Sequence, residues 1–368
     1  MSRAKLTDGE RGVLEAIRNH PFTTQKELAD KLNIARTTVA TYVDRLQSKG
    51  YLLGRAYVLA EHPSVCCFGG ATVDRTLMLH QPAILETSNP ATSHQHRGGV
   101  ARNVAENLVR LGVSARLISV IGNDEAGTAV IEETRRQGVD TSAVATSQDW
   151  PTGSYSAILQ PDGELFIGVS DLEICNALDR KLIDRRWGQI AAASLVFADT
   201  NGPADSLSYL LARCRDQDIR LCFDAVSVPK AGRLPNDLTG VEVMFCNAAE
   251  AREILGRPFL EASTEHLALA LCARGAVNAV VTEGPKGLWC AERGTCSFLP
   301  APPAEVVDVS GAGDALIAGA LCGWLMGLDA KESCTLGLHA ARITTQSVER
   351  NCSELSAEAL LMRAESDA

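Results

Sequence analysis

Between residues 195 and 290, short and almost continuously apolar stretches alternate with amphipathic ones, and this alternation limits the possible folds more than any other feature. The apolar stretches are SLVFADT, IRLCFDAV, VEVMFCN and AVVTEG, and helical patterns lie near 204–217, 248–255 and 264–274. Strands without polar alternation must be buried on both faces, which is typical of a parallel sheet covered by helices. The sequence therefore predicts an α/β domain built on a mostly parallel sheet.

Composition sets the broad class of the protein. The 368 residues suffice for one large α/β domain and a small one, and a hydrophobic content of 46% supports a sizeable core. There is no apolar run of about 18 residues that could span a membrane. The charged N-terminus, MSRAKLTDGERG, lacks the apolar core of a signal peptide. The 12 cysteines are scattered without a CxxC pair, which favours reduced thiols over structural zinc. We therefore expect a cytoplasmic protein without a membrane partner.

The first sixty residues differ in charge from the rest of the chain. They carry a net charge of +4 within a chain of net charge −10, which indicates two different partners. Three helical segments are expected here. The first runs from Glu10 to Asn19, Thr24 and Glu27 form a capping-box pattern that opens the second, and Gly50 ends the third.

The third segment has a polar outer face, formed by Arg36, Thr37, Thr38, Thr41 and Arg45. A following stretch, YLLGRAYVL, alternates like a short hairpin. Together they resemble the winged helix-turn-helix modules of bacterial transcription regulators, which implies double-stranded DNA as a partner of residues 1–60. A three-helix bundle used for dimerisation or regulation is the alternative. We place an all-α domain at 1–62 and a second domain at 63–368, because Glu61–Ser64 is polar and contains a proline.

The composition shifts toward strand formers between Gly138 and Ile174. The stretch TGSYSAILQPDGELFIGVSD predicts a hairpin around Pro161-Asp162-Gly163. A small sheet inserted into an α/β body is a candidate lid, which a reaction needs when water must be kept from a phosphoryl donor. We expect the lid elements within about 74–97 and 150–175.

Residues 306–321, VVDVSGAGDALIAGAL, predict a strand, a tight turn and the start of a helix. The N–H groups of Gly311, Ala312 and Gly313 would be unpaired donors at the positive end of a helix dipole, which is an anion site. Asp314 would repel a bound phosphate unless it has another task, and general-base catalysis of phosphoryl transfer fits. The alternative is a glycine cap and an acidic N-terminal residue on an ordinary helix.

Two further segments carry polar residues next to glycine turns. Asp74 follows a buried strand and a Gly-Gly turn in VCCFGGATVDRTLML, where it could hold two hydroxyls of a polyol or cap a turn. In GGVARNVAENLVRLG, residues 98–112, a second Gly-Gly turn leads into an amphipathic helix with Asn103 one turn inside. No GxxxxGK[ST] motif occurs, which excludes a P-loop nucleotide site.

These segments resemble the two signatures of the ribokinase-like, or PfkB, family of carbohydrate and nucleoside kinases, and the resemblance covers residues 64–355. It implies a ribokinase-like three-layer α/β/α domain with a small β lid, and an ATP-dependent phosphotransferase with an alcohol acceptor. In this family, Asp314 would be the catalytic base and Gly311, Ala312 and Gly313 the anion hole.

The resemblance also implies cofactor and substrate residues. Asn247 and Glu250 match the NxxE element that positions Mg²⁺, although alone they indicate a helix N-cap and a solvated acid. The matches to the nucleotide loop are Thr282, Gly284 and Gly287, and those to a monovalent cation site, such as one for K⁺, are Asp308 and Ser310. The matches on the substrate side are Asp74, Asn89, Gly98, Gly99, Asn103 and Lys230, of which Asn89 is also a good turn residue before proline.

Within the family, the segments TSNP (87–90), 98–112 and FDAVSVPKA (223–231) look most like the pseudouridine kinases. The leading hypothesis is phosphorylation of the 5′-hydroxyl of a ribonucleoside, pseudouridine first, although an aromatic content of 5% offers few residues for stacking a base. The alternatives are a kinase for a free sugar such as ribose or fructose, and a ligand-sensing regulator whose kinase fold has lost turnover. A homodimer is compatible with both expected domains, because related kinases pair through the lid and winged helices often bind DNA as dimers.

Overall fold

The structure is a computed structural model, and it describes residues 5–19, 23–53, 64–347 and 351–366. The expected wing continues past residue 53, and the expected domain boundary lies at residue 62. Most of the wing and the boundary itself therefore fall outside the described residues.

Three helices form the N-terminal part of the molecule: α1 (Asp8–Asn19), α2 (Gln25–Leu32) and α3 (Arg36–Ser48). Apolar side chains from one face of each helix, among them Ile17, Leu28 and Leu46, are fully buried between them. The predicted capping box is present, because the Thr24 side chain accepts from the Glu27 N–H while the Glu27 carboxylate accepts from the Thr24 N–H. The three predicted helices are therefore found where the sequence placed them.

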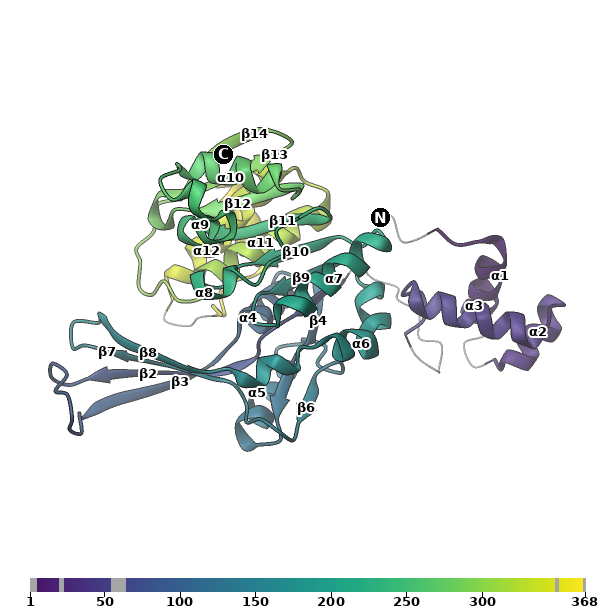
Figure 1. Ribbon diagram of the computed structural model, residues 1–368, viewed down its shortest axis with the longest axis horizontal. Helices are drawn as coiled ribbons and strands as arrows, with labels where there is room; N and C mark the ends of the chain where they lie inside the picture. Colours follow the sequence, from purple (N-terminus) through teal and green to yellow (C-terminus); the bar gives the residue numbers. More distant parts are fainter. Residues whose placement is uncertain (1–4, 20–22, 54–63, 348–350, 367–368) are drawn as a thin grey trace.

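The end of α3 packs against α6 (Arg180–Ala192) of the larger α/β part (Figure 1). Gly50 has a φ of +71°, and a Cβ added there would lie 2.1 Å from the backbone carbon of Ala191. The Gln217 side chain lies between the two parts, accepting from the Trp187 indole at 3.3 Å and donating to the Ser48 carbonyl at 3.0 Å. At position 50, only a glycine fits so close to the backbone of Ala191.

An eight-stranded sheet lies at the centre of the α/β part, in the order β14-β13-β12-β11-β10-β9-β1-β4. Its strands are β1 (Ser64–Phe68), β4 (Ser114–Ile118), β9 (Leu195–Asp199), β10 (Leu221–Asp224), β11 (Val241–Asn247), β12 (Asn278–Thr282), β13 (Gly287–Glu292) and β14 (Thr295–Pro300). All pairs from β12 to β4 are parallel, and β13 and β14 extend the sheet as an antiparallel edge. The mostly parallel sheet is confirmed.

Helices cover both faces of this sheet, and each layer encloses its own apolar core. One layer consists of α4 (Val100–Arg110), α5 (Glu125–Arg136), α11 (Ala312–Met326), α12 (Ala330–Thr345) and α13 (Ala357–Ser366). The other consists of α6, α7 (Ala204–Asp216), the short α8 (Val228–Ala231), α9 (Ala248–Leu255) and α10 (Thr264–Ala273). The short 3₁₀ segments are η1 (Glu173–Ala177), η2 (Arg257–Phe259) and η3 (Gly284–Lys286). The three-layer α/β/α fold is confirmed.

A separate four-stranded sheet extends from one side of this body (Figure 1). Its order is β3-β2-β7-β8, with β2 (Thr72–Leu79), β3 (Ala91–Gly98), β7 (Ser154–Leu159) and β8 (Leu165–Asp171). The antiparallel pair β7 and β8 is the hairpin expected around Pro161-Asp162-Gly163. Two short strands, β5 (Val120–Gly122) and β6 (Ala145–Ser147), pair elsewhere. This lid sheet is contiguous with the body through the turns that precede β2 and follow β3.

One sequence prediction about local structure is wrong. No strand forms at 306–310 within the described residues, and Val306, Val307 and Val309 are exposed. The N–H groups of Val307 and Asp308 donate to the Thr345 carbonyl at the end of α12 instead of to a neighbouring strand. Lys230 lies on the short helix α8.

No helix in the described part of the chain is both long and apolar enough to cross a membrane. All 12 cysteines are free thiols, and all but Cys272 and Cys296 are buried.

Candidate active site

Polar residues end neighbouring parallel strands at the carboxyl edge of the central sheet. Asp199 ends β9 and Asp224 ends β10, where the two residues are in register. Asn247 ends β11 and is in register with Thr282 at the end of β12. In open α/β sheets this edge is where ligands bind, because the loops that follow the strands surround a common crevice.

The N-terminus of α11 faces the same edge. Gly311 has a φ of +79°, a left-handed conformation that glycine adopts without strain, and the helix begins at Ala312. A Cβ added to the exposed Gly313 would meet nothing within 4 Å, so a ligand can approach the backbone here. One detail of the sequence prediction is wrong, because the Ala312 N–H donates to the Val309 carbonyl at 3.2 Å and is not an unpaired donor. The Gly313 N–H makes no hydrogen bond to any other residue that the structure describes.

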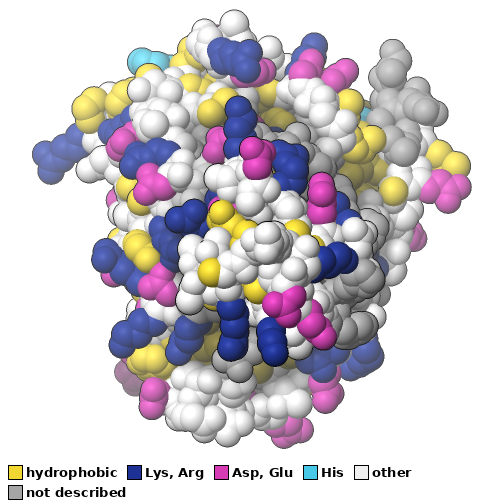
Figure 2. Space-filling model, turned by 90° about the vertical axis from the view of Figure 1, so that its right-hand side faces the viewer, with side chains coloured by type: hydrophobic (Ala, Val, Ile, Leu, Met, Phe, Trp, Pro, Cys, Tyr) yellow, Lys and Arg dark blue, Asp and Glu magenta, His cyan; other side chains and the backbone are white. Residues whose placement is uncertain are grey.

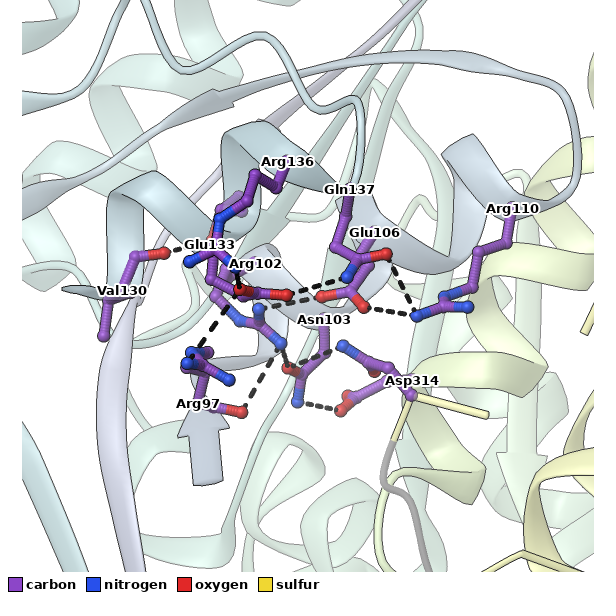
Figure 3. Close-up of polar contacts among 12 residues, drawn as sticks. Arg97, Arg102, Asn103, Glu106, Arg110, Val130, Glu133, Arg136, Gln137 and Asp314 are labelled. Carbon is purple, nitrogen blue, oxygen red and sulfur yellow. Dashed lines mark hydrogen bonds and ion pairs between the residues drawn. The ribbon is translucent and has the colours of Figure 1, made fainter. Parts of the chain in front are cut away.

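Asp314 lies in the first turn of α11 and is half-buried. Its Oδ2 accepts a hydrogen bond of 2.7 Å from Nδ2 of Asn103, on α4 (Figure 3). The two signature segments, 211 residues apart in the sequence, therefore meet through these two side chains. Asn103, expected on the substrate side, contacts the candidate base itself.

The lid begins next to these residues. Asp74 of β2 is 8% exposed, and its Oδ1 accepts from the Thr72 hydroxyl at 2.9 Å. A Cβ added to Gly98 would lie 2.3 Å from the Asp74 carboxylate, and one added to Gly99, with a φ of +96°, would lie 2.3 Å from the Gly70 carbonyl oxygen. Gly98 and Gly99 therefore let the end of the lid pass close to Asp74 and to the backbone at Gly70.

Lys230 of α8 reaches the same region. Its Nζ donates to Oδ1 of Asn201 at 2.6 Å. Burial lowers the Lys230 pKa, and the nearby carboxylates of Asp199 and Asp74 oppose this change. Asp74 and Lys230, which lie 156 positions apart in the sequence, are therefore brought close enough to interact electrostatically.

Asn89 is not brought together with these residues. It lies beyond the end of β2 that is remote from Asp74, and the five residue steps from Asp74 to Leu79 span about 17 Å of strand. Its amide accepts from the Ile84 N–H and donates to the Ile84 and Thr87 carbonyls, which is the turn role. A cavity of about 360 Å³ at this end of the lid is lined mainly by apolar side chains, including Leu77, Leu79, Ile84, Leu85, Ile158 and Phe166.

Asn247 and Glu250 form a capping box at the start of α9. Asn247 Oδ1 accepts from the Ala249 and Glu250 N–H groups, and Glu250 Oε2 accepts from the Asn247 N–H at 2.8 Å. The N-cap expected for Asn247 as the alternative is therefore present, but Glu250, expected there as a solvated acid, is buried. Thr282, Gly284 and Gly287 lie beside it in the turn from β12 to β13. The role of these five residues toward a nucleotide stays a prediction.

Asp308 and Ser310 lie in the loop before α11, where Asp308 Oδ1 accepts from the Ser310 N–H at 2.8 Å. The loop is thereby held in a tight turn in front of the Gly311 cap. Their role toward a monovalent cation stays a prediction.

The carboxylates at the sheet edge suit a divalent cation. Burial raises the Asp224 pKa well above its ordinary value, and the neighbouring carboxylates of Glu250, Asp314 and Asp199 raise it further. Burial also raises the Glu250 pKa. Within the described part of the chain, no group of three His, Cys, Asp or Glu side chains could hold a metal by itself. Mg²⁺ commonly binds through one or two carboxylates together with water and substrate phosphates, and these oxygens fit that mode.

Sequence reasoning missed three residues of this site: Asp199, Asp224 and Arg102. Asp199 is fully buried, and its carboxylate accepts from the N–H groups of Gly70, Ala101 and Asn201, which ties both glycine turns to β9. The signal for the two acids was available, because each ends a buried apolar strand that leads to the binding edge. Arg102 gave no such signal, since a basic residue on an amphipathic helix is ordinarily exposed.

The sequence matches two family models. Residues 62–355 match the model of the pfkB family of carbohydrate kinases, and residues 10–52 match a winged helix-turn-helix DNA-binding model. The chain belongs to the pfkB family of carbohydrate kinases and carries an N-terminal winged helix-turn-helix region.

Relatives include both sugar and nucleoside kinases. The chain is 30% identical to the uncharacterized sugar kinase YeiI of Escherichia coli K12, over 96% of this chain and 98% of the relative. It is 27% identical to the pseudouridine kinase of the same organism, over 75% of this chain and 88% of the relative. Among solved structures, a carbohydrate kinase from Agrobacterium tumefaciens superposes with a TM-score of 0.72 at 31% identity, covering 83% of this chain and 97% of that one.

Proposed function

We propose that this protein transfers the γ-phosphoryl group of ATP to the 5′-hydroxyl of a ribonucleoside, pseudouridine first. The observation that carries the proposal is the meeting of Asp314 and Asn103 at the N-terminus of α11, with Asp74 and Lys230 on the side from which an acceptor would approach. The likeness to a pseudouridine kinase and the segments 98–112 and 223–231 support the choice of nucleoside.

In the proposed reaction, Asp314 accepts the proton of the acceptor hydroxyl as the hydroxyl oxygen bonds to the γ-phosphorus. The bond from that phosphorus to the bridging oxygen breaks, and ADP leaves with the electron pair. The N–H groups of Gly311 and Gly313 lie at the positive end of α11, where they stabilise the charge on the transferred group. Mg²⁺, when bound, supplies positive charge that offsets the phosphates, and Asp224, Asn247 and Glu250 are the residues that would position it.

Asp74 and Lys230 would hold the hydroxyls of the sugar. A carboxylate can accept from two hydroxyls, and the lysine can donate to a third oxygen or to a base carbonyl. Holding the acceptor in line with the phosphorus converts an encounter of two molecules into an oriented reaction within one complex.

The test of this function is ADP release by the full-length protein with ATP, Mg²⁺ and K⁺ across a panel of acceptors. The panel is pseudouridine, uridine, cytidine, inosine, adenosine, ribose and fructose. Release with pseudouridine, or with another nucleoside, at a kcat/KM at least tenfold above that for ribose supports the nucleoside kinase. A preference for ribose or fructose would replace it with the sugar kinase, which the relation to YeiI favours.

A second function, DNA binding, rests on the exposed face of α3. Arg36, Thr37, Thr41 and Arg45 are exposed, and α6 approaches α3 at Gln47, whose carbonyl oxygen would lie 3.6 Å from a Cβ added to Gly188. Figure 2 shows this end of the molecule, where lysine and arginine side chains are spread over the surface with aspartate and glutamate side chains among them. A basic helix with short polar side chains suits the major groove. We propose that the ligand state of the kinase site alters DNA binding, because α6 joins α3 to β9, which ends at Asp199.

A further inference from the structure

Arg102 is a buried cation next to the proposed catalytic base. It follows the Gly98-Gly99 turn on α4 and is 2% exposed. Burial lowers its pKa, and the carboxylates of Glu106 and Asp314 oppose this change. A buried guanidinium is costly unless its donors are matched with acceptors, so the partners of Arg102 indicate what it does.

One partner is the ion pair with Glu106. Nη1 of Arg102 donates to Oε2 of Glu106 at 2.8 Å, while Arg110 donates to Oε1 of the same carboxylate at 2.9 Å (Figure 3). Glu106, 4% exposed, thus has two arginines for one negative charge. Neutralising Glu106 therefore does not require Arg102, and the three side chains together keep a net positive charge.

The second partner is the amide of Asn103. Nη2 of Arg102 donates to Oδ1 of Asn103 at 2.8 Å and, at 3.4 Å, to the Arg97 carbonyl. The Asn103 amide thus has a cation at its oxygen and the Asp314 carboxylate at its nitrogen (Figure 3). A flip of this amide would turn its NH₂ toward the guanidinium and its oxygen toward the carboxylate, so both contacts would become repulsive. Asn351 also approaches Oδ1, at 3.5 Å, with weaker geometry.

We propose that Arg102 is a positioning residue for the phosphoryl transfer, which acts through Asn103 to fix the orientation of the Asp314 carboxylate. The inference rests on the proposed function, because it assigns Asp314 the task of accepting the hydroxyl proton. A chain of hydrogen bonds runs from Glu106 through Arg102 and Asn103 to the Asp314 carboxylate. This chain holds the Asp314 carboxylate on the first turn of α11. A misplacement of about 1 Å in such a group can cost about a hundredfold in rate.

The test is the steady-state kinetics of a charge-balanced double variant, Arg102→Gln with Glu106→Gln, in the full-length protein. Removing both charges avoids leaving Glu106 with a single partner. We expect kcat to fall by about tenfold to a hundredfold, while the KM for the acceptor and for ATP stays within about threefold. A role confined to stability would lower the folded fraction but leave kcat per folded molecule unchanged. The matched control is Arg110→Gln, which weakens the same Glu106 pairing one turn further along α4 without touching Asn103, and its kcat should stay within twofold of wild type.

A double-mutant cycle separates action through Asn103 from a direct effect of charge. In an Asn103→Ala background, adding the two changes should lower kcat by less than about twofold, because the link to Asp314 is already lost. An equal decrease in both backgrounds, or a wild-type kcat in the double variant, would overturn the role of Arg102 while leaving the kinase reaction in place. Wild-type protein that releases no ADP with any acceptor in the panel would overturn the proposed function and, with it, this role.

Discussion

Asp224, at the end of β10, lies in register with Asp199 at the end of β9, so two carboxylates meet at the carboxyl edge of the sheet. Asp224 also faces Glu250 and Asp314, and its pKa is raised well above the ordinary value by burial and then by these carboxylates. The folded state thus holds the Asp224 proton to higher pH than the unfolded state does. The free energy of unfolding therefore decreases as pH rises from about 4, the unfolded value, through the folded pKa.

Replacing Asp224 by Asn removes this contribution. We expect Asp224→Asn to raise the melting temperature of the free protein by a few degrees near pH 7.5, and to change it much less near pH 4, where about half of the unfolded chains are also protonated at Asp224. Mg²⁺ should stabilise the wild type more than the variant if Asp224 helps to hold it. Thermal unfolding at several pH values, with and without Mg²⁺, measures both effects. Identical pH dependence in the two proteins would contradict the raised pKa.

The position of Lys230 predicts that replacing this residue weakens acceptor binding. Lys230→Met keeps much of the buried side-chain volume but removes the donor to Asn201 and the charge beside Asp74. We expect the KM for the acceptor to rise by about tenfold, with the KM for ATP unchanged. The control is Lys181→Met at an exposed position on α6. An unchanged acceptor KM in the Lys230 variant would remove this lysine from the acceptor site.

Gly99 and Gly112 form a matched pair of left-handed glycines. Each has a positive φ, but a Cβ at Gly99 would collide with the Gly70 carbonyl, whereas one at Gly112 would meet nothing within 4 Å. We expect Gly112→Ala to cost about 1 kcal/mol and leave turnover intact. Gly99→Ala should cost roughly 3 kcal/mol or more and lower kcat/KM as well, because it displaces the turn that carries α4. Denaturant unfolding and ADP release compare the two, and similar losses of stability in both would contradict the close approach.

From the exposed arginines of α3, we expect a DNA-binding activity that can be removed without loss of kinase activity. Arg36→Glu with Arg45→Glu should abolish binding to duplex DNA from upstream of its own gene, and should leave ADP release within twofold of wild type. Fluorescence anisotropy between 50 and 200 mM salt measures binding, whose affinity should fall steeply with salt in the wild type. Arg18→Glu, on α1, is the control for a general change of charge. Binding that survives the α3 changes would assign the helices to another role.

Much of the fold follows from local pattern. Buried strands without polar alternation predicted the parallel sheet, and the capping box at Thr24 predicted the start of α2 because both of its hydrogen bonds are local. The strand expected at 306–310 does not form, because the N–H groups of Val307 and Asp308 pair with the Thr345 carbonyl at the end of α12. This contact joins segments that are distant in the sequence, so no local pattern predicts it.

The site was predictable only in part. Asp314, Asn103 and Asp74 stand next to glycine turns, which mark close approaches of the backbone. Asp199 and Asp224 could have been found from their places at the ends of apolar strands. The role of Arg102 could not have been predicted from the sequence. It depends on a contact with Asn103 on the same helix, and Asn103 in turn contacts Asp314 on the distant α11.

The most direct test of the account is Asp314→Asn, which changes a carboxylate to an amide of nearly the same shape. We expect the variant to bind the acceptor, measured by calorimetry, with an affinity close to that of wild type. ADP release should fall to less than about a hundredth of the wild-type rate, because the proton acceptor is gone. Turnover above that level, with acceptor binding intact, would contradict the role of Asp314 as the base.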